Sequence, residues 1–284
     1  MRSRLPSSTS NIAFVSRIYK SYSCLFCKRY NSNESAELLK RLSLVDTAAL
    51  CDAHKSIYQA KHNNHFHVLP NSLIPLRNVS TTLGAPAHPS TMVGLVYTVQ
   101  CDSRNDILPV LEGLLKCPPH HVLVVHTKQS DCAVAGELFA TEAKRRNISG
   151  IVILDGSMRD TGNINKASQI GKVSPIYSYS VTPYSGTASA IGTLNTPLEF
   201  AIPRSDQIIS ISPGDIIVGD CDGIIISSQV TMETLIDLAE SIGSLEHKLL
   251  QKMRNGSCLI DMTNLCDHLE RLEHGETSTL EFKI

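Results

Sequence analysis

Apolar and polar positions follow a strand–helix–strand order in the middle of the chain. The short runs 122–125 and 151–154 contain only apolar, mostly β-branched residues, which is typical of buried strands. Between them, apolar residues recur at roughly helical spacing over 133–146, and Ser130 or Asp131 is placed to cap that helix. This order predicts a βαβ unit with two parallel strands joined by a crossover.

The segments before this unit predict two helices and two extended stretches. Leucines and alanines on one face favour a helix over 35–58, and a second helix over 107–115 should stop at the Pro118-Pro119 pair. Residues 93–99 predict a strand. Residues 72–87 predict extended structure in which the prolines mark a sheet edge.

The half of the chain after residue 160 has a different pattern. Its short apolar strands are separated by turns rich in glycine, proline and aspartate, which predicts a β-meander. A long amphipathic helix should follow from Val230 towards Met253 and end at Asn255-Gly256. The predicted strands are 176–181, 208–211, 216–218 and 224–226, and the tail from Cys258 to Ile284 leaves room for one more helix.

Length and charge narrow the class of protein. The 284 residues contain no internal repeat or low-complexity linker, so we expect a leader over 1–33, one globular domain over 34–256 and an extension over 257–284. The formal net charge of −1 offers no global field for nucleic acid or an anionic membrane. No apolar run approaches the ~20 residues of a membrane span. We therefore expect a soluble protein with neither partner.

Cysteines and histidines give only weak metal signals. The nine cysteines are an odd, scattered set, which favours reduced thiols over a disulfide framework. Cys24 and Cys27 have zinc-knuckle spacing, but no second pair completes a tetrahedral site. The histidines at 62, 65 and 67 have no fixed helical spacing, so a polar loop is the better interpretation.

The candidate chemistry lies beyond the strand at 151–154. The chain leaves that strand through residues 155–158 and delivers Arg159 and Asp160 side by side. We expect this end to meet the start of the preceding helix near Gly136, where backbone N–H groups are available. A cation, a carboxylate and helix amides suit an anionic substrate held with a metal ion. A solvated arginine paired with its neighbouring acid is the plainer alternative.

The wider pattern resembles the RraA-like family, which includes the 4-hydroxy-4-methyl-2-oxoglutarate aldolases. The likeness extends from about Leu42 to Ile242. The stretches that carry it are Gly136-Glu137-Leu138-Phe139-Ala140, Gly150-Ile151-Val152, Asp155-Gly156-Ser157-Met158-Arg159-Asp160, Val181-Thr182-Pro183 and residues 213–223.

The resemblance implies an α/β fold of the αββα, swivelling β/β/α type that contains the βαβ unit, the meander and the long C-terminal helix. It implies a homotrimer or homohexamer with sites at subunit interfaces. The implied activity is a divalent-metal-dependent carbon–carbon lyase that cleaves 2-oxo acids and releases pyruvate, often with oxaloacetate decarboxylation in the same site. By position, Asp160 would hold Mg²⁺ or Mn²⁺, Arg159 would bind the substrate carboxylate, and the amides of Gly136, Glu137, Leu138 and Phe139 would bind substrate.

General chemistry is consistent with these roles. Breaking the C3–C4 bond of a 2-oxo acid leaves a pyruvate enolate, and a divalent cation absorbs the charge at its keto oxygen. A guanidinium matches a carboxylate with two parallel hydrogen bonds. Glu137 would order a metal-bound water that gives or takes a proton.

Three departures from the family pattern bear on substrate choice more than on metal binding. Family enzymes usually have aspartate where Glu137 stands, and the interval from Gly136 to Arg159 is one residue longer than usual. Asn163 stands where the aldolase pattern has an acid.

Two other functions remain open. An aldolase that forms a Schiff base needs a desolvated lysine, and Lys128, just past a strand end, is the residue to consider. Some RraA-like proteins are regulators that bind a ribonuclease complex, so a protein-binding module with a vestigial site is the second alternative. The Arg159-Asp160 pair favours the metal-dependent enzyme over both.

Residues 1–33 have the composition of a mitochondrial transit peptide. They contain six basic residues, many serines and no acid before Glu34, with apolar residues interleaved. We predict import into the mitochondrial matrix with removal of this segment; a basic tail on a cytoplasmic protein is the alternative. A reporter fused to residues 1–40 should colocalise with mitochondria, and a reporter that stays in the cytosol would contradict the prediction.

Overall fold

The computed structural model describes residues 32–58, 65–69, 74–75, 92–202 and 207–282. The chain divides into two compact units, residues 1–41 and 42–284. The described helix α2 (Ser32–Leu42) belongs to the first unit except for its last residue. Most of the predicted leader, the Cys24–Cys27 pair and most of the stretch predicted to be extended over 72–87 lie outside the described residues.

Four parallel strands form the centre of the main sheet: β3 (Met92–Cys101), β4 (His121–His126), β6 (Gly150–Met158) and β7 (Ile176–Val181). They lie in the order β3-β4-β6-β7 and pair in parallel. This confirms the predicted strands and the parallel βαβ unit. The prediction that Asp155 to Met158 form an exit loop is wrong, because all nine residues of β6 are in the strand and buried.

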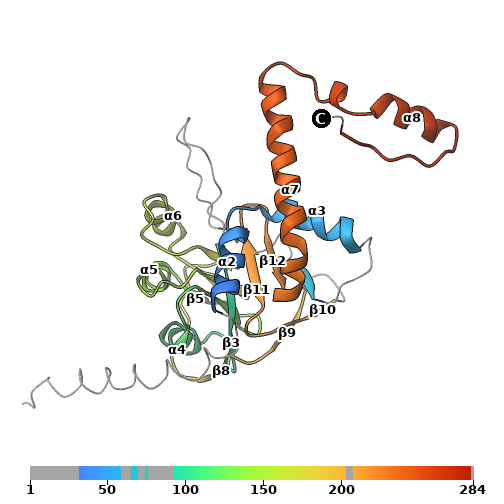
Figure 1. Ribbon diagram of the computed structural model, residues 1–284. Coiled ribbons are helices and arrows are strands. Elements are labelled where there is room, and N and C mark those ends of the chain that lie inside the picture. Colours follow the sequence, from blue (N-terminus) through green and yellow to red (C-terminus); the bar gives the residue numbers. More distant parts are fainter. Residues whose placement is uncertain (1–31, 59–64, 70–73, 76–91, 203–206, 283–284) are drawn as a thin grey trace, which may run out of the picture. The chain divides into compact units, whose positions relative to one another are not determined.

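Three helices cover one face of these strands, as Figure 1 shows: α4 (Leu108–Lys116), α5 (Glu137–Arg145) and α6 (Thr161–Gln169). Successive strand residues point to opposite faces. Ile151 and Ile153 therefore pack towards the helices, in a cluster with Leu114, Ala140 and Ile164. Burying each leucine or isoleucine of this cluster is worth roughly 1.5–3 kcal/mol.

The opposite face has a second core. Val152 and Leu154 point to this side and join Phe200 and Ile209 in another buried cluster. Phe200 and Ile209 belong to an antiparallel hairpin, β9 (Leu198–Ala201) and β10 (Ile208–Ile211). The sheet is thus covered on both faces, as expected for strands made almost wholly of apolar residues.

The predicted meander is only partly correct. β11 (Ile216–Gly219) and β12 (Ile224–Ser227) do form an antiparallel hairpin, but it joins β3 on the far side of the sheet from β7. The β9–β10 hairpin forms a separate two-stranded sheet. The short strands β1 (Phe66–Leu69), β2 (Ile74–Pro75) and β8 (Gly192–Leu194) pair antiparallel with β12, β7 and β3. The apolar run of a single strand does not indicate with which of the other strands it pairs.

Two predicted helices have different boundaries in the structure. Residues predicted to start the central helix form a strand, β5 (Ala133–Ala135), and α5 begins only after Gly136. Neither Ser130 nor Asp131 caps it. The helix predicted over 35–58 is two helices, α2 and α3 (Thr47–Tyr58). Asp46 separates them, because its Oδ1 accepts the N–H of Ala49 at 2.7 Å and caps α3.

The long C-terminal helix is confirmed as α7 (Gln229–Arg254), and it packs on α3. The Ser228 hydroxyl accepts the Thr231 N–H at its start, and Asn255-Gly256 ends it as predicted, with Gly256 at φ +96°. A short 3₁₀ turn (Ile260–Met262) and α8 (Leu265–Glu273) follow, which confirms a helix in the tail. In the part of the chain that the structure describes, no helix has the length and apolar character needed to span a membrane.

Candidate active site

Arg159 and Asp160 form the whole connection between β6 and α6. The Arg159 N–H donates to the Ala135 carbonyl at 3.1 Å, which ties this connection to the end of β5. Asp160 has a left-handed backbone (φ 63°, ψ 26°), which aspartate tolerates better than most residues. Its side chain makes no capping bond to α6, so its carboxylate is directed elsewhere.

Gly136 lies directly against this carboxylate. A Cβ atom at position 136 would lie 2.6 Å from Asp160 Oδ2 and 3.1 Å from Arg159 Cγ. The first distance is too short for any carbon–oxygen contact, so only glycine permits the approach. Asp160 Oδ2 is also 3.4 Å from the Glu137 amide nitrogen and 3.6 Å from Arg159 Nε. These contacts are long, so they leave lone pairs of the carboxylate available to a ligand.

The first turn of α5 supplies fewer open amides than the sequence predicts. The Phe139 N–H donates to the Gly136 carbonyl at 3.1 Å, and the Glu137 N–H faces Asp160. Leu138 is different, because its N–H has no acceptor among the described residues and its side chain is 77% exposed. The positive end of the α5 dipole and the Leu138 N–H therefore remain to attract an anion.

A cleft of about 350 Å³ opens beside the pair. The side chains of Arg159 and Asp160 are 42% and 39% exposed, so both reach solvent at this cleft. A smaller hollow of about 40 Å³ on the α5 side is lined by Gly136, Leu138 and Phe139 together with the same pair. The structure thus brings Gly136, Leu138, Phe139 and Arg159 to these cavities. The Glu137 N–H faces Asp160, but Glu137 lines neither cavity.

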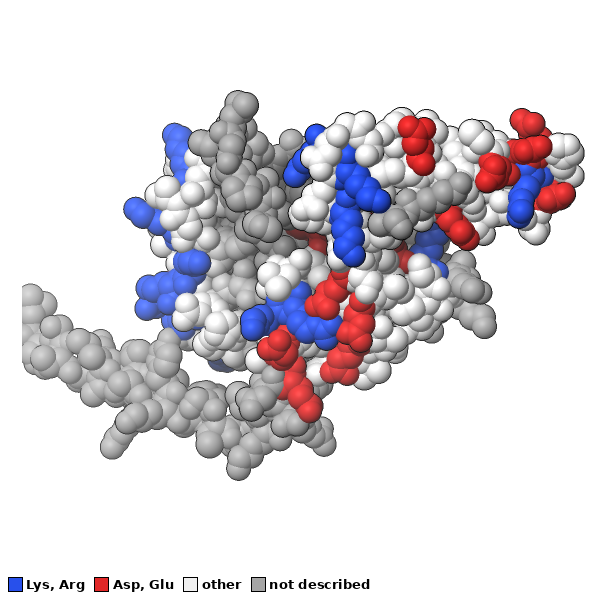
Figure 2. Space-filling model, turned by 45° about the horizontal axis from the view of Figure 1, so that its top comes forward, with Lys and Arg blue, Asp and Glu red and all other residues white. Residues whose placement is uncertain are grey.

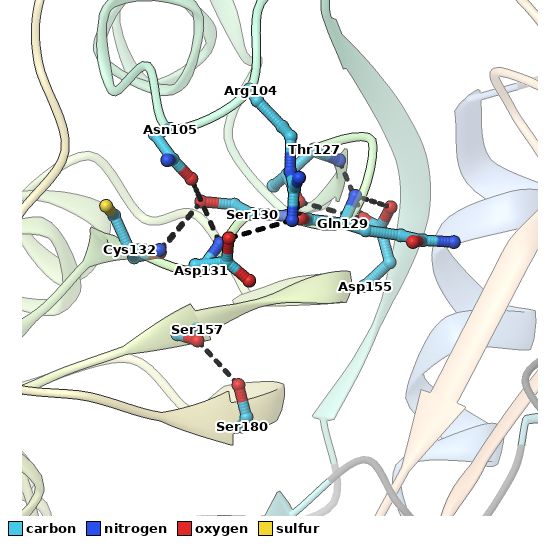
Figure 3. A network of polar contacts seen from close by, with 10 residues as sticks. All are labelled: Arg104, Asn105, Thr127, Gln129, Ser130, Asp131, Cys132, Asp155, Ser157 and Ser180. Carbon is cyan, nitrogen blue, oxygen red and sulfur yellow. Dashed lines mark hydrogen bonds and ion pairs between the residues drawn. The ribbon is translucent and has the colours of Figure 1, made fainter.

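The cleft adjoins a larger cavity of about 810 Å³, and the two share Val181 and Thr182. Figure 3 shows the polar network in its wall, which is organised by Asp155. This buried carboxylate accepts the N–H groups of Thr127 and Gln129, both at 2.7 Å. It also lies 3.3 Å from His126 Nε2.

The Asp155 network holds a loop in an unfavourable conformation. Lys128 and Gln129 both have left-handed backbones, at φ 58° and 62°, which costs roughly 1–2 kcal/mol per residue. Burial alone would raise the pKa of the Asp155 carboxyl, but hydrogen bonds from His126 and from the Thr127 and Gln129 N–H groups outweigh it and lower that pKa. The ionised form of Asp155 therefore stabilises the folded loop.

The position of Lys128 does not support a Schiff base. Its side chain is exposed, its ammonium donates to the Asp102 carbonyl at 3.3 Å, and it lines the larger cavity rather than the Arg159 cleft. A Schiff-base lysine needs desolvation or a neighbouring cation to become a nucleophile. The alternative based on Lys128 therefore has no geometric support.

Asp220, Cys221 and Asp222 form a second group whose ligand atoms all lie within 4.8 Å of one another. The Asp220 carboxylate is already used, however. It accepts the N–H and hydroxyl of Thr47 at 2.7 and 2.8 Å and the N–H of Asp222 at 2.9 Å. These bonds join α3 to the β11–β12 turn, so Asp160 is the better candidate ligand.

A family model described as RraA-like (Aldolase/RraA) matches residues 47–226. The chain belongs to the RraA-like family. The match contains the central strands, α4 to α6 and both residues of the Arg159-Asp160 connection, and it ends within β12.

Similar proteins agree with this assignment. A protein of Halalkalibacterium halodurans named "Putative 4-hydroxy-4-methyl-2-oxoglutarate aldolase" is 31% identical over 182 residues, which are 62% of this chain and 80% of that protein. A solved structure of an uncharacterised protein from Pseudomonas syringae pv. tomato has a TM-score of 0.59 at 24% identity, covering 80% of this chain and 96% of that one. Streptomyces coelicolor RraAS2, described as an unusual member of the RNase ES inhibitor RraA protein family, has a TM-score of 0.53 at 21% identity, covering 77% and 98%. The two structures establish the fold alone.

Replacing Gly136 by alanine should move the Asp160 carboxylate out of its present position. The new Cβ would displace the carboxylate. As a test of the expected role of Asp160 as a metal ligand, Mn²⁺ affinity, measured by electron paramagnetic resonance, should fall roughly tenfold or more. Gly243→Ala in α7 is the matched control, because nothing lies within 4 Å of a Cβ at that position and it lines neither cavity of the candidate site. Equal affinities in the two variants would contradict the assignment of Asp160.

Asp155→Asn tests the loop network through the free energy of unfolding in urea. The variant should lose about 1–3 kcal/mol at pH 7, because an amide presents a donor to the N–H groups. The pKa of Asp155 is lower in the folded state than its ordinary value of 3.8. The extra stability of the wild type is therefore fully present above pH 3.8, and it is lost as the pH falls through the pKa of the folded state. Asp131→Asn is the control. It removes the ion pair between Arg104 and Asp131, whose side chain is 77% exposed, and should lower the free energy of unfolding by at most ~1 kcal/mol. A pH-independent difference would contradict this role.

Proposed function

We propose that this RraA-like protein is a divalent-metal-dependent lyase that cleaves 2-oxo acids and releases pyruvate, as an aldolase, an oxaloacetate decarboxylase or both. The observation that carries the proposal is the contact between Gly136 and the Asp160 carboxylate. It holds that carboxylate at the start of α5, beside a guanidinium and at the mouth of a cleft. The aldolase name of the Halalkalibacterium relative supports the same class of reaction.

The residues at the cleft fit a hard divalent cation. Mg²⁺ and Mn²⁺ prefer oxygen ligands, and Mg²⁺ is often held by one or two carboxylates, with waters and substrate completing its shell. Asp160 offers such a carboxylate, partly exposed and not used to cap its own helix. When bound there, the cation would supply Lewis-acid stabilisation of the charge that develops on the keto oxygen.

Arg159 would bind and orient the carboxylate of the 2-oxo acid. Its Nε lies 3.6 Å from Asp160 Oδ2, which keeps the guanidinium beside the carboxylate, while the side chain is 42% exposed towards the cleft. Within the described residues its terminal nitrogens have no partner. The two terminal nitrogens of this planar guanidinium can therefore donate two parallel hydrogen bonds to a carboxylate.

The first turn of α5 would complete the binding of the anion. The Leu138 N–H has no acceptor among the described residues, and the helix dipole adds positive potential at the same point. Glu137 would act through an intervening water as proton donor or acceptor, since its carboxylate starts from the same turn. Asn163, which lines the cleft, offers an amide oxygen to such a water but no charge.

We also propose that the active form is a homotrimer or homohexamer, in keeping with the family resemblance. A cleft as open as the one beside Arg159 leaves the substrate in contact with bulk water, and a neighbouring subunit would close it. The alternative function is a regulator that binds a protein such as a ribonuclease and does not turn over 2-oxo acids. Metal-dependent pyruvate release from oxaloacetate by purified protein separates the two.

Asp160→Asn and Arg159→Lys should have separable effects. Asp160→Asn keeps the shape but removes the charge, so metal affinity and turnover should both collapse, with partial rescue at high Mn²⁺. Arg159→Lys should leave metal affinity unchanged and lower kcat/KM roughly 30- to 1,000-fold, because a lost bidentate contact is worth on the order of 2–4 kcal/mol.

Steady-state kinetics with oxaloacetate and a direct Mn²⁺ titration measure both effects. Chelation should abolish wild-type activity, and borohydride with substrate should leave the protein unlabelled. Activity that survives exhaustive chelation, or wild-type turnover by Asp160→Asn, would exclude this mechanism.

A further inference from the structure

The chain after α7 forms a small ordered arm, residues 255–282, beyond the family match at 47–226. α8 and a returning segment are tied together through Asn264. Its N–H donates to the Glu281 carbonyl at 3.1 Å, its Oδ1 accepts the Glu281 N–H at 2.7 Å, and its Nδ2 donates to the Thr279 carbonyl at 3.0 Å. A bridge between Thr263 and Phe282 closes the arm. The arm is therefore a defined surface.

The arm carries an apolar stripe that its own chain leaves uncovered. Leu265, Leu269 and Leu272 have the i, i+4, i+7 spacing that puts them on one face of α8. No residue of α8 is buried, and Leu269 and Leu272 are 49% and 50% exposed. Other arm residues with exposed fractions of 43–53% are Leu259, Ile260, Leu280 and Phe282. An amphipathic helix with such a stripe is suited to packing against a partner.

The charge of the arm is opposite to that of the helix layer α4–α6. The arm has six acidic side chains and one basic one, Arg271. The helix layer has six basic side chains and three acidic ones, counted over α4, over α5 with the following Arg146, and over residues 161–172, which include α6. Figure 2 shows this contrast, with red dominating the part at the upper right that carries α8 in Figure 1 and blue the left edge.

The same helix layer exposes apolar side chains that match those of the arm. Leu111 and Leu115 of α4 are 43% and 52% exposed, Leu138 of α5 is 77% exposed, and Ile170 after α6 is 64% exposed. The same layer carries the exposed lysines Lys144 in α5, Lys166 in α6 and Lys172 just after α6. One surface is thus apolar and basic, and the other is apolar and acidic.

We propose that the arm of one copy of this chain docks on the α4–α6 layer of a second copy. Both complementary surfaces are present in the same polypeptide, which favours self-association over a different partner. An arm with excess negative charge is also repelled by anionic membranes. The contact joins two different surfaces, so repeating it around an axis gives a ring, such as a trimer, when the rotation between copies closes. The proposal concerns assembly and does not depend on catalytic activity.

Docking on this layer would also bring the second copy to the candidate site. Leu138 lines the small hollow beside Asp160, at the first turn of α5. A leucine stripe packed there would cover the exposed side of that hollow and restrict water at the neighbouring cleft. Assembly through the arm therefore gives a physical reason for a complete site only in the oligomer.

Charge reversal in the full-length protein tests the contact by sedimentation velocity. Glu270→Lys/Glu273→Lys and Lys166→Glu/Lys172→Glu should each raise the subunit dissociation constant roughly tenfold at low salt, and combining all four changes should restore assembly. Leu269→Ser/Leu272→Ser should weaken it roughly 100-fold or more. Val230→Ser, at a position 72% exposed on α7, is the control and should leave assembly unchanged. A monomeric wild type, or a quadruple variant that assembles no better than either pair, would overturn the proposal.

Cross-linking between copies gives a second measurement that does not depend on dissociation. Cys266 is exposed on α8, three residues before Leu269, and can be joined to nearby lysines by a short thiol–amine reagent. In a complex of ¹⁴N- and ¹⁵N-labelled copies, mixed-isotope peptides should link Cys266 to Lys166 or Lys172. Links from Cys266 only within one copy, or between copies only to other surfaces, would contradict the proposed docking.

Discussion

The contact between Gly136 and the Asp160 carboxylate is the constraint on which the candidate site depends. It needs two strands, β5 and β6, to end side by side, and it needs the residue after β5 to have no side chain. The left-handed backbone of Asp160 then turns the carboxylate towards the start of α5 instead of its own helix. Removing any one of these conditions would move the carboxylate away from the amides and from the guanidinium.

The end of β6 and the connection that follows it line two adjacent cavities. Asp155 is buried and fixes the loop 127–131 in the wall of the larger cavity, whereas Arg159 and Asp160 reach solvent at the smaller cleft. Both lie at the carboxyl ends of parallel strands, where open α/β sheets bind ligands. The rigid core beneath them, apolar on both faces of the sheet, keeps these polar groups in place.

The proposed division of labour follows from the two side chains themselves. A single aspartate is a sufficient protein ligand for a cation that keeps its waters and takes further oxygen atoms from a 2-oxo acid. An arginine beside it balances the charge of the substrate carboxylate without competing for the metal. The proposed docking of the arm would make a second copy of the chain part of the working molecule.

The sequence by itself determined the elements whose signals are local. The apolar runs at 122–125 and 151–154, the periodicity of α4 and α7, and the Asn255-Gly256 stop needed no information from the rest of the chain. The family motif also predicted that Gly136, Arg159 and Asp160 lie together, and in the structure they do. Only the tertiary structure decided that Asp155 to Met158 continue β6, because polar residues stay in a buried strand only when distant groups such as Thr127 satisfy them. It also decided the partners of β7 and of the two hairpins. Those choices depend on contacts between residues far apart in the chain, and local patterns carry no information about them.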